Sequence, residues 1–483
     1  MAMRQSLRRC RKWISMVEVR ADLAPDLGNE DWPGLLAELR REKLPVIWTV
    51  RWGAEGGAFQ GSEEERRAWI SKGESWGADY VDVEAASPVA GGYRPKRAGL
   101  VLSHHDFTGT PEHPEEIVAR LETQNPHTVK VAFKAGATRD LRRVLGLYRR
   151  PATRPLVAIA MGEWGEASRL LPAASGLPWT YAMDPEAGPA APGQFAAREL
   201  SELYRIEKVS PRTRLFCVIG NPVAHSLSPL LHNRTYAELG LDALYARVRV
   251  DDFQEFLALA DILGLQGASV TIPHKEAAAA FAAPDSWVRR AGAANTLARQ
   301  SGGAWKIENT DVAAALVSLR EALAVSSSPR VLVLGAGGVA RSLVWGLIGA
   351  GYKVAVAGRT RERAAALARE TGADLVEWKQ RTSLGFDAVL NGTPVGMSPK
   401  VDETPLAFPT PCPRLVAFDT VYTPEETLFL KLARASGART LSGRGMFWRQ
   451  AALQHALWFG GDPPNALMQR LLAEAGAGEK AGK

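Results

Sequence analysis

Cysteine, long apolar runs and excess charge are scarce in this sequence, and each scarcity excludes a class of protein. The three cysteines, Cys10, Cys217 and Cys412, lie about 200 residues apart without paired spacing, which excludes a disulfide framework or a zinc finger and fits a reducing compartment. No run of about 18 uninterrupted apolar residues occurs, which excludes a membrane-spanning helix. The 59 basic residues exceed the 52 acidic ones by only seven. No basic block has interleaved aromatic residues, so we expect no nucleic-acid partner.

What is present is the composition of an ordinary globular protein. The chain of 483 residues is 46% hydrophobic and 23% charged, and its length suggests three domains, or two if one is a large α/β barrel. The opening segment MAMRQSLRRCRKW is basic but lacks the apolar core of a secretion signal. A transit peptide is an alternative reading, but only about 15 residues precede sequence with the pattern of a folded domain. We therefore expect a cytoplasmic protein.

The N-terminal 200 or so residues alternate short apolar strands with longer helical segments. Segments such as 114–124 and 138–150 carry apolar residues at helical spacing. Because continuous apolar strands alternating with helices form parallel sheets, this many units predicts a closed β/α barrel of the TIM type. The predicted strands are 44–51, 78–85, 99–107, 128–134 and 155–162, with a weaker one at 179–184.

Polar side chains stand near the ends of four of these strands. They are Arg51, Glu84, His105 and Lys130. Any one of them alone would fit an ordinary surface charge in a loop. A β/α barrel builds its active site at the carboxyl ends of its strands, so four such residues together predict a site there.

A polar segment, 205–214, interrupts the strand pattern, which restarts at 215–220. We place the main domain boundary at this interruption. The expected domains are a barrel over 1–208, an α/β substrate-binding domain formed by 214–325 with 441–475, and a Rossmann nucleotide-binding domain over 328–440.

A glycine-rich turn follows the first strand of the third domain. The segment VLVLGAGGVARS (331–342) is a strand followed by Gly335, Gly337 and Gly338, then Ala340 and a helical run. This is the G-x-G-x-x-A form of the dinucleotide-binding fingerprint. Its glycines permit a tight turn and let backbone amides approach a pyrophosphate at the helix N-terminus.

The end of the next predicted strand, 353–360, distinguishes the two nicotinamide cofactors. An acidic residue there would bind the ribose 2′-hydroxyl of NAD, but the chain instead has Arg359 and Thr360, followed by Arg361 and Arg363. A guanidinium forms forked hydrogen bonds with a 2′-phosphate, which a carboxylate would repel. The sequence therefore predicts NADP as the cofactor.

Several further motifs occur in order after residue 214. They are GNPVAHSLSPLLHN (220–233), GASVTIPHKEAA (267–278), GAANTL (292–297), ENTDVAAAL (308–316), NGTPVGM (391–397) and GMFWRQA (445–451). Together with the nucleotide motif they resemble shikimate dehydrogenase over the whole of 214–475.

The resemblance to shikimate dehydrogenase implies roles for the matching residues. Ser226 and Ser228 would hold the substrate carboxylate, and Lys275 and Asp311 would form the catalytic pair beside the carbonyl that is reduced. The positions implied to bind the ring hydroxyls are Thr271, Asn295 and Gln450, and those implied to bind the adenosine phosphate are Arg359, Thr360 and Arg363. Reduction of a ketone independently requires the same residue types, because a lysine ammonium can stabilise and protonate the alkoxide that forms.

The N-terminal block resembles type I 3-dehydroquinate dehydratase across roughly 16–200. The matching segments are MVEVRADL (16–23), VRWGAEGG (50–57), YVDVEA (80–85), LSHHDFTGTP (102–111), TVKVA (128–132), AMGEWGEASR (160–169) and APGQ (191–194). The resemblance implies that Lys130 forms an imine with the substrate and that His105 is the general acid and base. Glu18, Arg20, Arg51 and Glu55 would lie around them, with Arg169 and Gln194 on the substrate carboxylate and hydroxyls.

Loss of water from a β-hydroxy ketone needs an electron sink, which a neutral lysine supplies as a Schiff base without any metal. We expect burial near arginine to lower the pKa of Lys130 for this purpose. A histidine that titrates near pH 7 can take the α-proton and return one to the leaving hydroxyl. His104 competes with His105 for that role but should point to the opposite face of its strand. Lys134 shares a face with Lys130 and is the stronger rival.

The dehydratase-like block departs from the family at its start. Glu18 comes so early that no room remains for the usual first strand and helix of the barrel. Either the barrel closes differently, with the segment 3–14 contributing a lone helix, or the start of the chain is truncated.

The sequence thus predicts a bifunctional enzyme that dehydrates 3-dehydroquinate and reduces the product to shikimate with NADPH. One alternative is a shikimate dehydrogenase with an inactive or regulatory dehydratase-like domain. Another is a catabolic quinate/shikimate dehydrogenase that uses NAD, against which Arg359 and the pair Ser226 and Ser228 argue. The expected partners are small-molecule substrates only, without a membrane, and the sequence leaves the oligomeric state open.

Overall fold

The computed structural model describes residues 2–481 except 25, 27, 29, 152, 187–192, 284–285, 324–327, 383–384 and 409–410. The expected boundary at 325 and the first two residues of APGQ lie outside this described part. The chain forms two compact units, Met1–Phe216 with Gly240–Leu265, and Cys217–Leu239 with Gln266–Lys483. The segment Gly240–Leu265 falls inside the range expected for the substrate-binding domain, yet it packs with the first unit.

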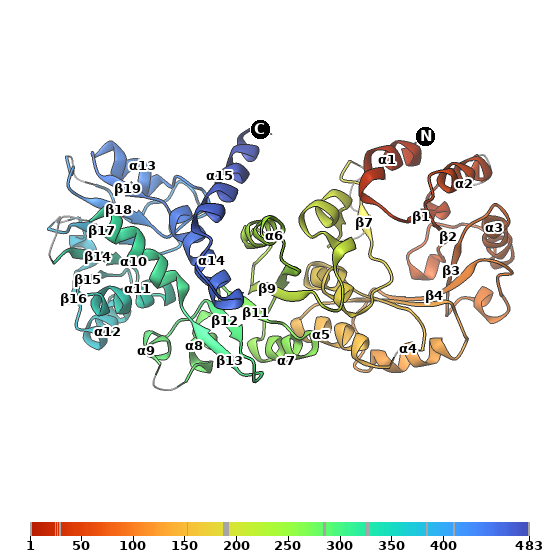
Figure 1. The fold of residues 1–483 in the computed structure, drawn as a ribbon, viewed down its shortest axis with the longest axis horizontal. Helices are drawn as coiled ribbons and strands as arrows, with labels where there is room; N and C mark the ends of the chain where they lie inside the picture. Colours follow the sequence, from red (N-terminus) through yellow and green to blue (C-terminus); the bar gives the residue numbers. More distant parts are fainter. Residues whose placement is uncertain are drawn as a thin grey trace. The chain divides into compact units, whose positions relative to one another are not determined.

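A parallel sheet of six strands forms the centre of the first unit, in the order β1-β2-β3-β4-β5-β6 (Figure 1). The strands are β1 (Val17–Arg20), β2 (Val46–Thr49), β3 (Tyr80–Glu84), β4 (Gly99–Asp106), β5 (Thr128–Lys134) and β6 (Leu156–Met161). The helices between them are α2 (Trp32–Arg41), α3 (Glu63–Ser75), α4 (Pro114–Glu122) and α5 (Thr138–Gly146). The five stronger strand predictions are confirmed as β2 to β6.

The register of this sheet brings polar residues side by side. Glu84 pairs with Ser103 across β3 and β4, and Ser103 pairs with Lys130 across β4 and β5. Thr49 pairs with Asp82 across β2 and β3. Paired residues in neighbouring strands point to the same face, so Glu84, Ser103 and Lys130 form one row of side chains.

The sheet is buried by aromatic packing against the helices. Trp48 is fully buried and meets Trp32 and Trp76 edge to face, with ring centroids 5.2 and 5.6 Å away. A Cβ on Gly73 of α3 would lie 2.2 Å from the Trp48 ring, so this helix approaches β2 only because residue 73 is glycine. Such edge-to-face pairs contribute about 0.5–1.5 kcal/mol each beyond the area they bury.

The weaker strand prediction at 179–184 shrinks to β7 (Ala182–Met183), which pairs with β8 (Phe195–Ala196) as a separate two-stranded ladder. The predicted lone helix in 3–14 is confirmed as α1 (Ala2–Cys10). Residues of α1, β1, α2 and β7 line a cavity of about 210 Å³. Ser6 and Arg9 bond to Asp184 beside β7. In the described residues, therefore, a helix rather than a further strand lies between β1 and β7.

The second unit contains a parallel sheet in the order β16-β15-β14-β17-β18-β19. Its strands are β14 (Arg330–Leu334), β15 (Lys353–Ala357), β16 (Asp374–Leu375), β17 (Ala388–Asn391), β18 (Val416–Asp419) and β19 (Arg439–Leu441). Numbered from β14, this is the 3-2-1-4-5-6 order of dinucleotide-binding folds, whose ligand crevice lies where the order reverses, between β14 and β17. The helices of this fold are α11 (Gly338–Gly349), α12 (Arg361–Thr371) and α13 (Leu428–Ala435).

Mixed strands and helices complete the chain. β11 (Gly267–Val270) pairs antiparallel with β12 (Thr296–Arg299), which pairs antiparallel with β13 (Trp305–Glu308). The other elements are β9 (Arg214–Gly220), α6 (Ser228–Glu238), β10 (Ala243–Arg249), α7 (Phe253–Leu263), α8 (Lys275–Phe281), α9 (Trp287–Ala291), α10 (Thr310–Ala322), α14 (Gly443–Phe459) and α15 (Asn465–Ala481).

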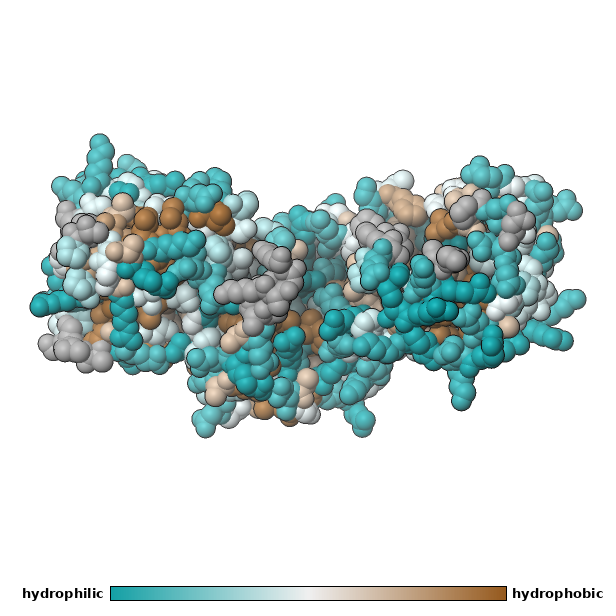
Figure 2. Space-filling view, turned by 90° about the horizontal axis from the view of Figure 1, so that it is seen from above, coloured by the Kyte–Doolittle hydropathy of each residue, from teal (hydrophilic) through white to brown (hydrophobic). Residues whose placement is uncertain are grey.

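Apolar residues are few and scattered on the face in Figure 2, which is mostly hydrophilic. Of the helices described, none is long and apolar enough to cross a bilayer. Two exposed apolar side chains adjoin predicted site residues: Phe107 stacks on His105 at a centroid distance of 6.4 Å, and Ile272 follows Thr271.

Candidate active sites

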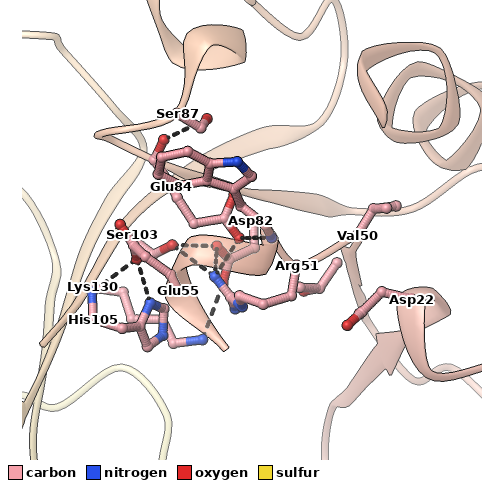
Figure 3. A network of polar contacts seen from close by, with 12 residues as sticks. Asp22, Val50, Arg51, Glu55, Asp82, Glu84, Ser87, Ser103, His105 and Lys130 are labelled. Atoms are coloured by element: carbon pink, nitrogen blue, oxygen red, sulfur yellow. Dashed lines mark hydrogen bonds and ion pairs between the residues drawn. The ribbon is translucent and has the colours of Figure 1, made fainter. Parts of the chain in front are cut away.

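Lys130 belongs to a buried polar network in the first unit (Figure 3). Its Nζ is 3.0 Å from Asp82 Oδ2 and 3.7 Å from Glu18 Oε1. The ring centroid of Tyr181 is 4.7 Å from the same nitrogen. Lys130 is only 5% exposed, whereas its rival Lys134 is exposed at the end of β5. The burial and the carboxylate partners single out Lys130 as the candidate nucleophile.

Arg51 links the carboxylates of this network. Its guanidinium donates to Asp82 at 3.0 and 2.8 Å, to Glu84 at 2.9 Å and to the Ser103 hydroxyl at 2.9 Å. Arg66 reaches the other oxygen of Glu84 at 2.7 Å. Buried charges need such partners, and every charge of this group has at least one. The network therefore holds a fixed electrostatic field around Lys130.

The pKa of Lys130 shifts in the direction opposite to the one expected from the sequence. Burial alone would lower it, but the carboxylates of Asp82 and Glu18 raise the pKa above its ordinary value. Asp82 in turn has a pKa well below its usual range: burial would raise it, but Arg51 and Lys130 outweigh that effect. The expected lowering of the Lys130 pKa was wrong because it considered the neighbouring arginine and left out the carboxylates of Asp82 and Glu18.

His105 and Glu55 form a pair next to Lys130. His105 Nδ1 is 2.8 Å from Glu55 Oε2, which also accepts the His105 backbone N–H at 2.9 Å. Burial raises the pKa of Glu55 to about 7, and burial with the charges of Arg51 and Lys130 lowers the pKa of His105 well below its ordinary value. His105 is therefore neutral at pH 7, and the expectation that it titrates there was wrong. The group that titrates is its partner.

His104 lies closer to this pair than the strand alternation predicted. Its Nδ1 is 3.9 Å from Glu55 Oε1, and its ring lies 5.9 Å from the Phe133 ring. Glu55 therefore stands between the two histidines, but only His105 contacts it at hydrogen-bond distance.

The remaining predicted residues of this site differ in their partners. Arg169 is 3% exposed, and its Nε has no hydrogen-bond partner among the described residues. Burial lowers the pKa of Arg169 to about 10, so it stays charged at pH 7. The Oε1 of Gln194 is likewise buried and without a partner in the described part of the chain. Arg20 instead makes a two-pronged ion pair with Asp22, at 2.9 and 2.8 Å.

Sequence reasoning missed Asp82 and Tyr181. Asp82 carries the strongest interaction of Lys130, and it stands two residues before Glu84 on the same face of β3. Two carboxylates at alternate positions of an otherwise apolar strand were the signal that could have found it. Tyr181 gave no such signal, because it stands just before β7, which has only two residues.

Lys275 and Asp311 meet in the second unit as the sequence predicted. Lys275 Nζ is 2.7 Å from Asp311 Oδ2, and both side chains are about five-sixths buried, at 17% and 16% exposed. Lys275 is the first residue of α8 and Asp311 the second of α10. Asn309 caps α10 by accepting the Val312 N–H at 3.2 Å, which fixes the start of the helix and the direction of the carboxylate.

Asn295 and Gln450 form a hydrogen-bonded group in the same unit. Asn295 Nδ2 donates to Thr310 Oγ1 at 3.0 Å and to Gln450 Oε1 at 3.3 Å, and its Oδ1 accepts the Thr310 N–H at 2.7 Å. Gln454, which sequence reasoning missed, donates to the Asn295 carbonyl at 3.2 Å. Asn295 directly precedes β12, Thr310 begins α10, and both glutamines lie on α14, so the group joins hydrogen-bonding side chains from three parts of the fold.

Of the other predicted substrate positions, Ser226 and Thr271 lie on the loops that follow β9 and β11, and Ser228 is the first residue of α6. Ser228 is buried and donates its backbone N–H to Ser226 Oγ at 3.2 Å. A Cβ on Gly220 would lie 2.4 Å from the Thr271 side chain, so glycine lets these two loops approach. Tyr422, which the sequence did not indicate, has its pKa raised by burial and by the nearby Asp311 carboxylate.

The glycine-rich turn has the shape that a dinucleotide requires. Gly335 has φ +108°, and a Cβ there would lie 2.8 Å from Thr393, so only glycine fits. A Cβ on Gly337 would meet nothing within 4 Å. Gly337, Gly338 and Arg363 line a cavity of about 560 Å³. The residues present therefore fit a bound dinucleotide.

The arginines after β15 differ in their pairing. Arg361 pairs with Glu377 at 2.8 Å. Arg359, Thr360 and Arg363 are exposed, and within the described residues neither Arg359 nor Arg363 has an ion pair. Arg363 lines the cavity, and a guanidinium without a carboxylate partner at that place is suited to a phosphate. No three His, Cys, Asp or Glu side chains of the described chain are grouped so as to hold a metal ion.

A parallel β/α unit with a buried lysine among carboxylates, joined to a dinucleotide-binding unit with a Lys–Asp pair, defines an enzyme with two separate reaction sites. The model of type I 3-dehydroquinase matches residues 1–211. The models of the shikimate dehydrogenase substrate-binding domain and of shikimate/quinate 5-dehydrogenase match residues 218–297 and 319–388.

Whole proteins give the same result. The chloroplastic bifunctional 3-dehydroquinate dehydratase/shikimate dehydrogenase of Arabidopsis thaliana is 33% identical over 488 residues, which cover 95% of this chain and 80% of that protein. The NADP+ shikimate dehydrogenase of Methanocella arvoryzae is 40% identical over 272 residues, 54% of this chain and 98% of the relative. A crystal structure of a shikimate dehydrogenase with NADP+ covers 55% of this chain and 96% of its own, with TM-score 0.52 and 30% identity. The chain belongs to the family of bifunctional 3-dehydroquinate dehydratase/shikimate dehydrogenases.

Proposed function

We propose that Lys130 and Lys275 are the reacting centres of two consecutive steps, dehydration of 3-dehydroquinate and reduction of 3-dehydroshikimate by NADPH. The observation that carries the proposal is the buried group of Lys130, hydrogen-bonded to Asp82, and His105, hydrogen-bonded to Glu55. A domain kept only for binding or regulation would not need this set of reacting groups. The test is to assay each step alone, formation of the conjugated enone without cofactor and reduction of added 3-dehydroshikimate with NADPH. Failure of the first step alone would support the inactive-domain alternative.

In the dehydratase site the carboxylates stabilise the positive charge on the lysine nitrogen. The imine that Lys130 forms with the ketone carries a positive charge, and Asp82 and Glu18 stabilise that charge as they stabilise the ammonium. Lys130 must first lose a proton; the neutral amine then adds to the ketone, whose oxygen leaves as water when the imine forms. His105 takes the α-proton and delivers it to the leaving hydroxyl, which departs as a second water, while Arg169 and Gln194 hold the carboxylate and hydroxyls. Addition of water to the imine then releases the product and restores the lysine amine.

In the dehydrogenase site the lysine acts on the alkoxide. Bound NADPH supplies the hydride. The Lys275 ammonium stabilises and protonates the oxygen that becomes negative, and Asp311 at 2.7 Å keeps Lys275 charged and directed. Asn295 and Gln450 offer amide groups to the ring hydroxyls, and Ser226 and Ser228 offer donors to the carboxylate.

Dehydration is expected to slow below about pH 7, because protonation of Glu55 removes the free base form of His105. When Glu55 is a carboxylate it accepts the Nδ1–H of His105, which leaves Nε2 free as a base. When Glu55 gains a proton it donates to Nδ1, the imidazole proton moves to Nε2, and the base is lost. Because the pKa of Glu55 is raised to about 7, kcat/KM should fall about tenfold per pH unit below that value.

The check is the pH profile of Glu55→Gln. The amide oxygen can accept the same N–H groups without titrating, so the acid limb near pH 7 should disappear. The variant His104→Ala removes the neighbouring histidine and should keep the wild-type limb. An unchanged limb in Glu55→Gln would show that another group controls the base.

NADPH is expected to be used far better than NADH, and Arg359→Ala should remove much of that preference. One lost charge-assisted hydrogen bond to the 2′-phosphate costs about 1.5–3 kcal/mol, or roughly 10- to 100-fold in the KM for NADPH, with little change for NADH. Arg361→Ala is the matched control, because Arg361 already pairs with Glu377. Equal use of both cofactors by the wild type would refute the assignment.

A further inference from the structure

Residues of the dehydrogenase half contact the loop that carries Arg169 of the dehydratase site. This loop is the 3-10 helix η6 (Glu163–Arg169), which directly follows β6. The contacting residues lie on β10, inside the range matched by the shikimate dehydrogenase substrate-binding model. β10 and η6 belong to the same compact unit, so their contacts are internal to it.

Arg247 of β10 makes the most direct of these contacts. Its Nη2 is 2.6 Å and its Nε 2.8 Å from Glu166 Oε1. Both side chains are about four-fifths buried, at 21% and 20% exposed. Glu166 stands three residues before Arg169, and residues three apart share one face of a 3-10 helix. The pair therefore fixes the turn from which Arg169 projects.

Arg247 also reaches the second substrate-binding segment. Its guanidinium carbon is 6.0 Å from the ring centroid of Phe195, which directly follows Gln194, and its Nη2 is 3.8 Å from Glu199 Oε1. One side chain thus contacts both segments that supply residues for the substrate carboxylate and hydroxyls.

Neighbouring contacts hold β10 and α7 in place within the first unit. Arg249 pairs with Glu163 at 2.5 Å and lies over the Trp164 ring at 4.5 Å. Thr138 bonds to Asp251 at 2.5 Å, and Arg142 of α5 bonds to Glu255 of α7 at 2.5 Å. These bonds hold β10 and α7 against the carboxyl end of the sheet's last two strands and the helix between them. Arg247 therefore acts from a fixed base.

We propose that Arg247 is a positioning residue for the dehydratase reaction, supplied by the dehydrogenase half of the chain, which holds η6 and the Gln194 segment so that Arg169 meets the substrate carboxylate. The inference rests on the proposed role of Arg169. Arg247 itself takes no part in the chemistry. Because misplacement of a binding group by about 1 Å can cost up to 100-fold, loss of the clamp should weaken substrate binding more than the chemical step.

The test uses the full chain and the 3-dehydroquinate kinetics of four variants. Arg247→Met should raise KM about tenfold or more while kcat changes less than about threefold. Glu166→Gln, which removes the same ion pair at constant size, should do likewise. Arg247→Lys should recover part of the loss by restoring the charge. Arg150→Met is the matched control, since it removes a partly buried ion pair of the same kind, with Glu122 of α4 at 2.8 Å, that involves neither η6 nor β10, and it should keep the wild-type KM.

A fifth variant, Arg169→Ala, separates the two claims. If it leaves KM unchanged, the proposed role of Arg169 fails. If it raises KM but Arg247→Met and Glu166→Gln do not, the role stands and the clamp is overturned. Reduction of 3-dehydroshikimate should stay at the wild-type rate in Arg247→Met. If that variant does not fold, Glu166→Gln decides.

Discussion

Lys130→Met is expected to abolish dehydration of 3-dehydroquinate, together with the trapping of substrate on the protein by borohydride, while 3-dehydroshikimate is still reduced at the wild-type rate. Methionine has a similar length but no amine, so the covalent route is closed. The fold should persist, because Asp82 keeps its two hydrogen bonds from Arg51 when the lysine is gone. Intact-protein mass after borohydride treatment and an NADPH oxidation assay measure the two outcomes.

The matched control is Lys134→Met. Lys134 lies on the same strand but is exposed, so its variant should trap substrate and dehydrate it normally. Trapping by Lys130→Met would show instead that Lys134 is the nucleophile.

Lys275→Met is expected to do the reverse and to remove reduction of 3-dehydroshikimate. The side chain is both proton donor and electrostatic partner of the developing alkoxide, and loss of one such donor costs about 3–4 kcal/mol, or roughly 100- to 1000-fold in kcat. Asp311→Asn should lose less, since it weakens only the orientation of the lysine. Steady-state reduction with saturating NADPH measures the loss.

Lys306→Met provides the control for this site. Lys306 lies on β13 in the same unit, is half exposed and pairs with Glu308 at 3.2 Å. Its removal should leave both activities unchanged. A Lys275→Met variant with wild-type reduction would exclude the lysine as the proton donor.

The elements that the sequence identified best are those whose pattern is local. Strands β2 to β6 are short, largely apolar runs, and the glycine turn at Gly335 needs a positive φ that few other residues adopt. Lys275 and Asp311 were expected to pair from the resemblance to shikimate dehydrogenase, and the structure brings their side chains together. Local sequence therefore predicted which residues come to the sites.

The electrostatics of the dehydratase site could not be predicted in the same way. The sign of the pKa shift of Lys130 depends on Asp82, which lies 48 positions away and meets it only through the strand pairing. The pKa of His105 depends on burial and on two cations from other strands. The contact of Arg247 with Glu166 joins two halves that the motifs treat as separate. Each of these is a tertiary effect that no local pattern records.

The segment before β1 was predictable in its secondary structure but not in its packing. The sequence offered a lone helix over 3–14 as one of two interpretations of the segment before Glu18. The structure has α1 beside β1 and β7, held by the bonds of Ser6 and Arg9 to Asp184. The helix prediction was correct because the segment lacks turn residues, but its packing partner was not predictable from spacing.

The most direct test of two working sites in series is a coupled assay that starts from 3-dehydroquinate and NADPH alone. The wild type should oxidise one NADPH for each 3-dehydroquinate consumed. Lys130→Met and Lys275→Met should each show no flux, and a mixture of the two variants should restore it, because each supplies the site that the other lacks. A wild type that reduces added 3-dehydroshikimate but consumes no NADPH with 3-dehydroquinate would contradict the account and leave a dehydrogenase joined to an inactive domain.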